Sequence, residues 1–398
     1  MMLDHVVPTA ALDDARAWLG TEARALLDVQ AAVSAIPAPT GGESDRAKFM
    51  AAAFGRAGLR SIETDAAGNV LATWGGDAGG SPVALCAHLD TVFGPEVDVG
   101  VRRDGARLVG PGIGDNARGL AGLIAMARLL ARNGWRSRHP VWLVATVGEE
   151  GVGNLRGMRH IFVERRIAAR AAIALDGPGD DRIVHRALGS RRYRVGFTGP
   201  GGHSWNAFGI ANPAHAAGDF VKDVADWSRA QPKGTACSVV RLGGGTGLNT
   251  IPSQTWIEVD LRSENPDALM TGDKALREHA DAAGRRENAR RNLGSPALTH
   301  AIELIGERPA GSTPTEHPLV RAAVEATRAI GRSPTLAAAS TDANIPMALG
   351  IPSISIGAGG RGGDTHLRSE WYEDVDGALG LFRVFHLVAA VAGIEDAG

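Results

Sequence analysis

Acidic and imidazole side chains recur in this chain at the points where apolar runs end. Carboxylates brought together repel one another and lose hydration unless a cation neutralises them. Carboxylate oxygens combined with imidazole nitrogens suit zinc, and also cobalt or manganese. The pattern therefore favours a pair of divalent metal ions. The residues concerned are His88, Asp90, Asp115, Glu149, Glu150, Asp176 and His366.

Taken alone, each of these residues could have a purely structural role instead of binding metal. Asp115 could be a helix N-cap, for instance, and His88 a buried, hydrogen-bonded imidazole. Their combination carries the metal hypothesis. The sequence contains no His-Glu-x-x-His motif, no Walker A loop and no Gly-x-Ser-x-Gly elbow. These absences argue against the corresponding zinc protease, nucleotide and serine hydrolase sites.

Four apolar runs precede the polar clusters, and their length is typical of strands buried on both faces of a parallel or mixed sheet. A helical pattern covers residues 116–132, with Asp115 in position to cap it. Open α/β sheets bind ligands at the carboxyl ends of their strands, so we expect the clusters to converge. The runs are PVALCAHLD (82–90), VWLVATVGEE (141–150), AAIALDG (171–177) and PSISIGAGG (352–360).

The middle of the chain has a different pattern of apolar and polar residues, typical of strands with one face exposed to solvent. Alternating strands such as TWIEVDLRS and helical patterns near 212–229 and 266–290 give the order β-α-β-β-α-β, which predicts a small inserted α+β domain. We therefore predict an α/β fold with a mixed, mostly parallel sheet sandwiched by helices. Its discontinuous catalytic domain would comprise residues 1–187 plus 305–398, and the inserted domain residues 188–304.

The net charge, the number of cysteines and the apolar segments exclude several classes of function. The formal net charge is -2 and the chain has only two cysteines, so neither a nucleic-acid partner, nor a membrane partner, nor a disulfide framework is indicated. The N-terminal segment has acidic residues in place of a signal peptide's basic start, and the apolar stretch 378–393 is too short and too charged to span a membrane. We expect a soluble cytoplasmic enzyme.

In order and spacing, the motifs H-x-D, G-D-N, E-E, a strand-end Asp and a late His resemble those of the dinuclear zinc metallopeptidases. That family includes peptidase T, carnosinase, aminoacylase-1, succinyl-diaminopimelate desuccinylase and bacterial glutamate carboxypeptidases. The resemblance implies two metal ions per subunit, with Asp115 bridging them. It assigns His88 and Asp176 to one ion, and Glu150 and His366 to the other.

The resemblance also implies catalytic roles. Glu149 would be the general base that takes a proton from the attacking water. Asp90 would hold the imidazole of His88 in the tautomer that binds metal. The peptide bond between Asp115 and Asn116 would be cis, as in the family.

The inserted segment resembles the family's lid and dimerisation domain, and so implies a homodimer. His203, in GPGGHSW, would reach the partner subunit's active site and stabilise the oxyanion. Asn249 would contact substrate, Arg262 would bind a substrate carboxylate, and Gly359 would let backbone amides approach the substrate. A surface ion pair for Arg262 and a plain loop at Gly359 remain alternatives.

Within the family, an Asp at the position of Asp176 is usual in aminopeptidases and dipeptidases. This favours hydrolysis of short peptides with a free amino terminus. The alternatives are an N-acyl-amino-acid amidohydrolase or carboxypeptidase with the same metals, and a non-catalytic binding or scaffold protein. The complete ligand set and Glu149 argue against the last.

Overall fold

A computed structural model describes residues 7–76, 80–132 and 134–395. The chain divides into two compact units, Met1–Ala187 with Ser312–Gly398 (unit 1) and Leu188–Gly311 (unit 2). The sequence-based boundary at 304/305 falls inside a strand, Thr299–Arg308, that pairs along its length within unit 2. For this reason the boundary lies at 311/312. Residues 1–6, which open the segment that lacks signal-peptide features, lie outside the described part.

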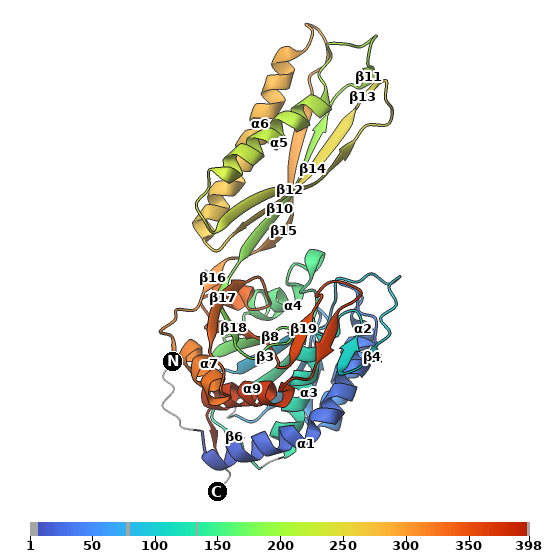
Figure 1. Cartoon of the computed structure of the whole chain (residues 1–398). Coiled ribbons are helices and arrows are strands. Elements are labelled where there is room, and N and C mark those ends of the chain that lie inside the picture. Colours follow the sequence, from blue (N-terminus) through green and yellow to red (C-terminus); the bar gives the residue numbers. More distant parts are fainter. Residues whose placement is uncertain (1–6, 77–79, 133, 396–398) are drawn as a thin grey trace. The chain divides into compact units, whose positions relative to one another are not determined.

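Unit 1 is built on a mixed central sheet (Figure 1). Its four middle strands, which are the four apolar runs of the sequence, pair with one another in parallel, whereas the pairs at the β1 edge are antiparallel. The predicted fold class is confirmed. Over the described residues the order is β1 (Ser61–Thr64), β2 (Val70–Trp74), β7 (Val141–Thr146), β3 (Val83–His88), β8 (Ala171–Leu175), β18 (Ser353–Ile356), β9 (Arg182–Ala187) and β16 (Gly311–Ser312), with β17 (Thr335–Ala339) pairing to β9.

Helices bury both faces of this sheet, which explains the continuous apolar runs. In β3, Val83 and Leu85 belong to the larger core on one face, and Ala84 and Cys86 to a smaller core on the other. The helices are α1 (Thr9–Ser34), α2 (Ser44–Arg56), α3 (Ala117–Arg132), α7 (Pro318–Ala329) and α9 (Gly377–Ala392) on the first face, and α4 (Arg156–Arg159) with the π-turn η2 (His160–Glu164) and α8 (Asn344–Ala348) on the second.

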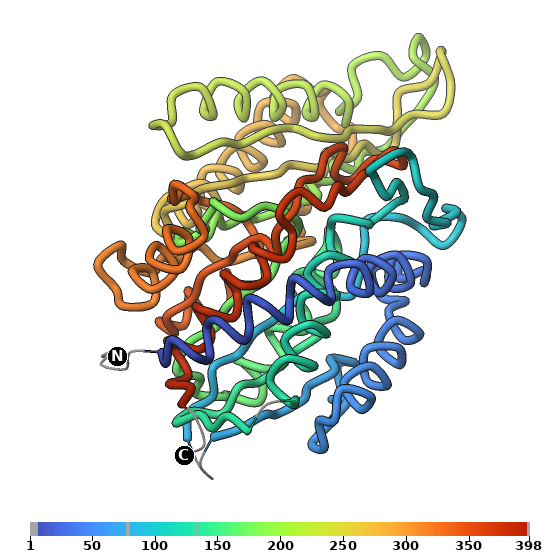
Figure 2. Tube along the Cα trace, turned by 60° about the horizontal axis from the view of Figure 1, so that its bottom comes forward, coloured from blue at the N-terminus to red at the C-terminus, as the bar shows by residue number. Residues whose placement is uncertain are grey.

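The first and last long helices of the described residues pack together in the larger core. Helix α1 contacts both α3 and α9, so that the first and last long helices lie side by side (Figure 2). Shorter elements complete unit 1: a small sheet of β19 (Arg361–Gly363), β20 (Trp371–Glu373), β5 (Arg107–Val109) and β4 (Arg102–Asp104), the pair β21 (Ile394–Glu395) and β6 (Arg136–Ser137), and the 3-10 turn η1 (Gly151–Gly153).

Unit 2 is an antiparallel sheet covered on one face by two helices. Its element order matches the β-α-β-β-α-β expectation. Asn212 and Asn265 cap the two helices, each followed by a proline in the first turn. The elements are β10 (Gly189–Thr198), β11 (Gly202–His203), α5 (Pro213–Arg229), β12 (Thr235–Gly244), β13 (Thr250–Ile251), β14 (Gln254–Ser263), α6 (Pro266–Arg290) and β15 (Thr299–Arg308).

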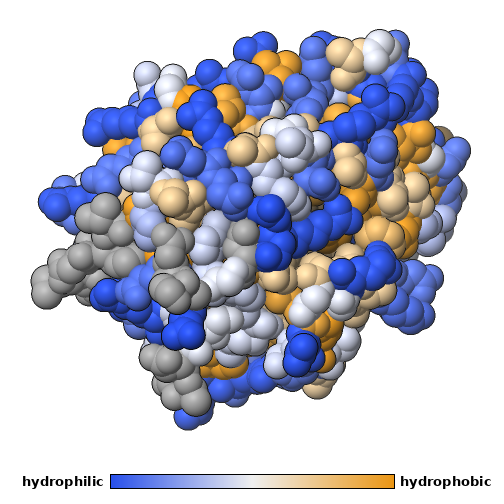
Figure 3. Space-filling model, turned by 90° about the horizontal axis from the view of Figure 1, so that it is seen from below, coloured by the Kyte–Doolittle hydropathy of each residue, from blue (hydrophilic) through white to orange (hydrophobic). Residues whose placement is uncertain are grey.

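Among the described residues, none of the helices combines the length and apolar character needed to cross a membrane. The face of the molecule in Figure 3 is covered mainly by hydrophilic residues, with apolar residues in smaller patches between them.

Candidate metal centre

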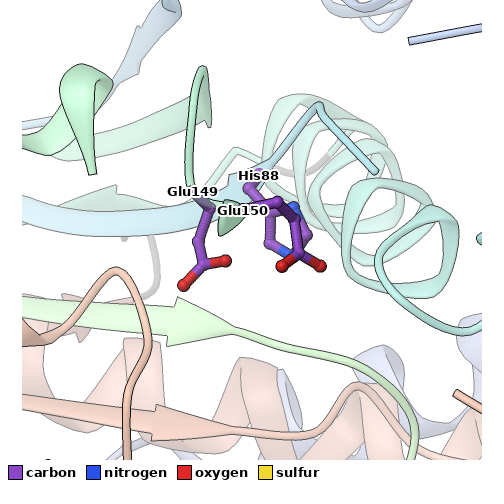
Figure 4. Close-up of side chains that lie close together, drawn as sticks. All are labelled: His88, Glu149 and Glu150. Atoms are coloured by element: carbon purple, nitrogen blue, oxygen red, sulfur yellow. The ribbon is translucent and has the colours of Figure 1, made fainter. Parts of the chain in front are cut away.

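The site forms where the parallel strands of unit 1 end. Strand β3 ends at His88, the turn after β7 carries Glu149 and Glu150, and Asp176 directly follows β8. Because these strands are parallel neighbours, their carboxyl ends meet at one edge of the sheet. Figure 4 shows the side chains of His88, Glu149 and Glu150 extending to the same side of the strand ends.

Among the described residues, three groups of side chains could each hold a metal ion: His88, Glu149 and Glu150 form one, and the other two share Asp115. The two groups that share Asp115 are the following. The first comprises His88, Asp115 and Asp176, and the second comprises Asp115, Glu150 and His366. Within each group, one ligand atom per residue lies within 4.8 Å of the others. These are the two ligand sets that the family resemblance implies, with Asp115 common to both.

Asp115 is the centre of the arrangement. Its Oδ1 lies 2.9 Å from Nε2 of His88, and its Oδ2 lies 3.2 Å from Nε2 of His366. The same His366 nitrogen lies 3.0 Å from Oε1 of Glu150. Each oxygen of one carboxylate therefore faces a different imidazole, as bridging two ions requires.

The electrostatics of the cluster favour added positive charge. Burial raises the pKa of Asp176 to about 7, and the charge of Asp115 adds to the shift. Hydrogen bonds with Asp115 and Glu150 raise the pKa of His366 to about 10. Burial lowers the pKa of His88, but its hydrogen bond with Asp115 helps to hold that pKa well above its usual value. These raised pKa values mean that the cluster favours the protonated forms of Asp176, His366 and His88. A bound metal cation would stabilise the negative charges of the carboxylates in place of those protons.

The donor set fits divalent metals. Two ligand atoms bound to one ion at about 2.1 Å lie at most about 4.2 Å apart, so clusters within 4.8 Å need only small side-chain adjustments. Two imidazoles and three carboxylates are ligands that zinc accepts. The histidine and carboxylate atoms now share hydrogen bonds that metal coordination would replace.

Asp90 contacts both the imidazole of His88 and the Glu149–Glu150 turn, and its effect on the imidazole's tautomer stays a prediction. Nδ1 of His88 lies 2.9 Å from the backbone carbonyl oxygen of Asp90, whereas the Asp90 carboxylate is 3.6 Å away. That carboxylate accepts the backbone N–H groups of Glu149 and Glu150, each at 2.9 Å. The nearest Asp90 atom to the imidazole is thus its backbone oxygen, while its side chain lies within ion-pair distance of His88 and also holds the Glu149–Glu150 turn.

The helix cap differs from the expectation. The peptide bond between Asp115 and Asn116 is cis, as predicted, and α3 begins at Ala117. Asn116 Oδ1 accepts the N–H groups of Gly119 and Gly177, each at 3.1 Å. Capping therefore falls to Asn116, and the carboxylate of Asp115 faces the histidines.

Three predicted site residues lie in unit 2. His203 and Asn249 are neighbours there, because β11 pairs with β13 and Ser204 N–H donates to the Asn249 carbonyl at 2.8 Å. Nδ1 of the exposed His203 accepts the N–H of Trp205 at 3.2 Å. A neutral His203 then carries its proton on Nε2, which makes it a donor.

Arg262, on β14, donates through Nε to Asp260 at 2.8 Å and is 38% exposed. The surface ion pair considered for this arginine therefore exists. Its contact with substrate stays a prediction, as do the contacts of His203 and Asn249.

Gly359 has a packing reason to be glycine. A Cβ there would lie 2.7 Å from the Gly377 carbonyl oxygen and 2.8 Å from the Gly380 Cα, at a φ of +86°. Its own N–H donates to the Gly179 carbonyl at 2.9 Å. The Gly359 N–H is therefore already bonded within unit 1, and the approach of this glycine run's backbone amides to substrate stays a prediction.

One supporting residue was missed from the sequence. Glu370 is 1% exposed, and its carboxylate accepts backbone N–H groups of the segment that ends at Asp115. It lies four residues after His366, and because this spacing belongs to none of the metal-binding motifs considered, nothing in the sequence was a reason to select it.

The two ligand groups that share Asp115 fit a dinuclear metal centre, a kind of site that metal-dependent hydrolases use to activate water. Residues 84–390 match the family described as Peptidase family M20/M25/M40, and the chain belongs to this family. A comparison with curated proteins found no significant match.

Solved structures with the same fold are distant in sequence. Aminopeptidase PepT from Bacillus cereus has a TM-score of 0.73 and 20% identity, covering 92% of this chain and 98% of its own. The dipeptidase Dug1p from Saccharomyces cerevisiae has a TM-score of 0.70 and 15% identity, covering 96% and 98%. An amidase of the hydantoinase/carbamoylase family from Burkholderia multivorans has a TM-score of 0.64 and 18% identity, also covering 96% and 98%.

Proposed function

We propose that this chain removes the first residue from di- and tripeptides with a free amino terminus, using two divalent ions held by its dinuclear site. The observation that carries the proposal is the pair of ligand groups sharing Asp115, with Glu149 buried beside His88 and Glu150. The solved aminopeptidase, tripeptidase and dipeptidase structures of the same fold support peptides as the substrate class.

The chain's own residues supply the proton transfers. Bound metal ions would polarise the scissile carbonyl and acidify the attacking water. Glu149, placed beside ligand Glu150, takes the proton of that water and delivers it to the leaving amine nitrogen. Asp90 keeps Glu149 in position through the backbone of its turn. His203 of the partner subunit donates from Nε2 to the developing oxyanion.

Zinc is the metal we propose first, with cobalt and manganese as alternatives, because carboxylate and imidazole ligands suit all three. We also propose a homodimer formed through unit 2. Its edge strand β12 exposes Val240 at 54% and Leu242 at 66%, a surface that a second copy could cover. The buried free thiols of Cys86 and Cys237 fit a cytoplasmic location.

The test is a matched substrate pair given to zinc- or cobalt-reconstituted protein: a free-amine tripeptide and its N-acetylated form. Release of the first residue from the free-amine peptide alone is the expected result. Cleavage of the acetylated form alone would replace the proposal with the amidohydrolase or carboxypeptidase alternative, and Arg262 would then be the residue to mutate. Cleavage of neither would contradict the proposed substrate class.

The amidohydrolase alternative is kept because an amidase of the hydantoinase/carbamoylase family shares the fold. A non-catalytic scaffold is separated more simply, since it would purify and remain without stoichiometric metal even when zinc is supplied.

A further inference from the structure

Glu370 is a buried acid outside both ligand groups. Its Oε1 accepts the N–H groups of Gly114 and Asp115, each at 2.8 Å, and its Oε2 accepts the N–H of Gly112 at 3.0 Å. Its backbone carbonyl accepts a fourth N–H, from Gly110, at 2.9 Å. One residue therefore holds the whole segment that leads into the shared ligand Asp115.

The position of Glu370 in the chain links this segment to a second ligand. His366 lies four residues earlier, and a turn joins them through hydrogen bonds from Leu367 N–H to Asp364 O and from Glu370 N–H to Leu367 O. On its other side Glu370 leads directly into β20, which pairs with β5. Its backbone is thus anchored between the late histidine and a sheet that adjoins the Asp115 segment.

We propose that Glu370 is a positioning residue that sets the distance between Asp115 and His366, and through it the affinity of the dinuclear centre for metal. The two ligands come from segments 251 residues apart. They must nevertheless be held to within a few tenths of an ångström for coordination. A carboxylate that accepts three backbone N–H groups can hold this geometry, because both of its oxygens act only as acceptors.

The local sequence is adapted to this carboxylate. Gly112 has a φ of +73°, and a Cβ on Gly114 would lie 3.0 Å from Oε1 of Glu370. Both glycines let the backbone wrap around the acid with its N–H groups turned inward. A side chain at position 114 would press on the carboxylate and push the two segments apart.

The experiment measures metal binding by the full-length protein with Glu370→Gln. A carboxamide loses one acceptor oxygen and places an N–H₂ group against a backbone N–H, so the Asp115 segment should shift. We expect zinc affinity, measured by competition with a chromogenic chelator, to fall about 10–100-fold. The absorption spectrum of the cobalt-substituted protein should change in the same variant, because it reports ligand geometry. Circular dichroism checks that the variant is folded.

Asp65 offers a matched control. Its Oδ1 also accepts three backbone N–H groups, from Ala67, Gly68 and Asn69, but it belongs to neither ligand group. Asp65→Asn should lower thermal stability and leave zinc affinity and the cobalt spectrum unchanged. Should Glu370→Gln fail to fold, Glu370→Asp, which keeps the charge but is too short to reach all three N–H groups, takes its place with the same expected loss.

The inference rests on the proposed dinuclear site, and its failure can be told from the failure of that site. Wild-type protein that binds no zinc would overturn the proposed function and this inference with it. Wild-type protein that binds two zinc ions, together with a folded Glu370 variant that binds them equally tightly, would overturn the positioning role alone.

Discussion

Glu149 is 5% exposed and lies next to ligand Glu150. It belongs to neither of the two ligand groups that share Asp115. Its proposed task is proton transfer, so Glu149→Gln should retain both metals and the fold and lose about 10²–10⁴-fold in kcat. Metal analysis and steady-state kinetics check this. Glu278→Gln, an exposed acid on α6, serves as the control with unchanged kcat, and a near-normal kcat in Glu149→Gln would remove the base assignment.

Asp90 is fully buried and connects three parts of the site. Its carboxylate accepts the N–H groups of Glu149 and Glu150 and the hydroxyl of Thr40. In Asp90→Asn one of these donors faces an N–H₂ group, so the Glu149–Glu150 turn should move. We expect a drop of about 10–100-fold in both kcat and zinc affinity.

Thr40→Val tests how Asp90 is held. This variant removes only the hydroxyl's hydrogen bond and should cost far less activity than Asp90→Asn. Equal losses in the two variants would mean that Asp90 does not act through the backbone of the turn.

At the scale of elements, the close approach of the Gly359 turn to α9 is a packing requirement. Both Gly359 (φ +86°) and Gly331 (φ +75°) have positive φ, but a Cβ on Gly331 would have nothing within 4 Å. Gly359→Ala should therefore destabilise the protein by about 1–3 kcal/mol more than Gly331→Ala. Urea unfolding of the two variants measures the difference, and equal stabilities would contradict the packing argument.

Helix α9 also carries a pH-sensitive side chain. Burial lowers the pKa of His386, so the folded protein favours its neutral form. Its contribution to stability is complete above the unfolded pKa of about 6.5 and is lost as pH falls through the lowered folded value.

The free energy of unfolding should therefore depend less on pH below about 6.5 in His386→Leu than in the wild type. Urea unfolding between about pH 5 and 7 gives both slopes. Identical slopes would show that His386 does not titrate differently on folding.

For the whole molecule, metal binding should stabilise the fold. A ligand at 100 times its Kd adds about 2.7 kcal/mol per site, which for a unit of this size corresponds to about 5–10 °C in Tm. Zinc added to chelator-treated protein should restore activity and raise Tm by this amount or more. His366→Ala, which removes one ligand from one group, should show a smaller rise; an unchanged wild-type Tm would contradict a metal centre built into the folded state.

Much of unit 1 follows from local pattern. The continuous apolar runs predict buried parallel strands, because only a sheet covered on both faces excludes water from every side chain of a run such as 83–88. The same reasoning placed His88, Glu149, Glu150 and Asp176 at strand ends, where parallel neighbours bring them to one edge. The two helices of unit 2 could also be predicted from the sequence, because an Asn-Pro pair stands at the start of both α5 and α6.

The hydrogen bonds that position the site residues depend on contacts between segments far apart in the sequence, and these contacts could not be predicted. They determine that Asp90 contacts both an imidazole and a turn, that Asn116 rather than Asp115 caps α3, and that the Gly359 amide is already bonded. Glu370 is the clearest case, because its three partners lie more than 250 residues away in the chain. Periodicity and spacing report which residues share a strand, a helix face or a short motif. The hydrogen bonds that align ligands from separate segments arise only when the folded chain brings those segments together.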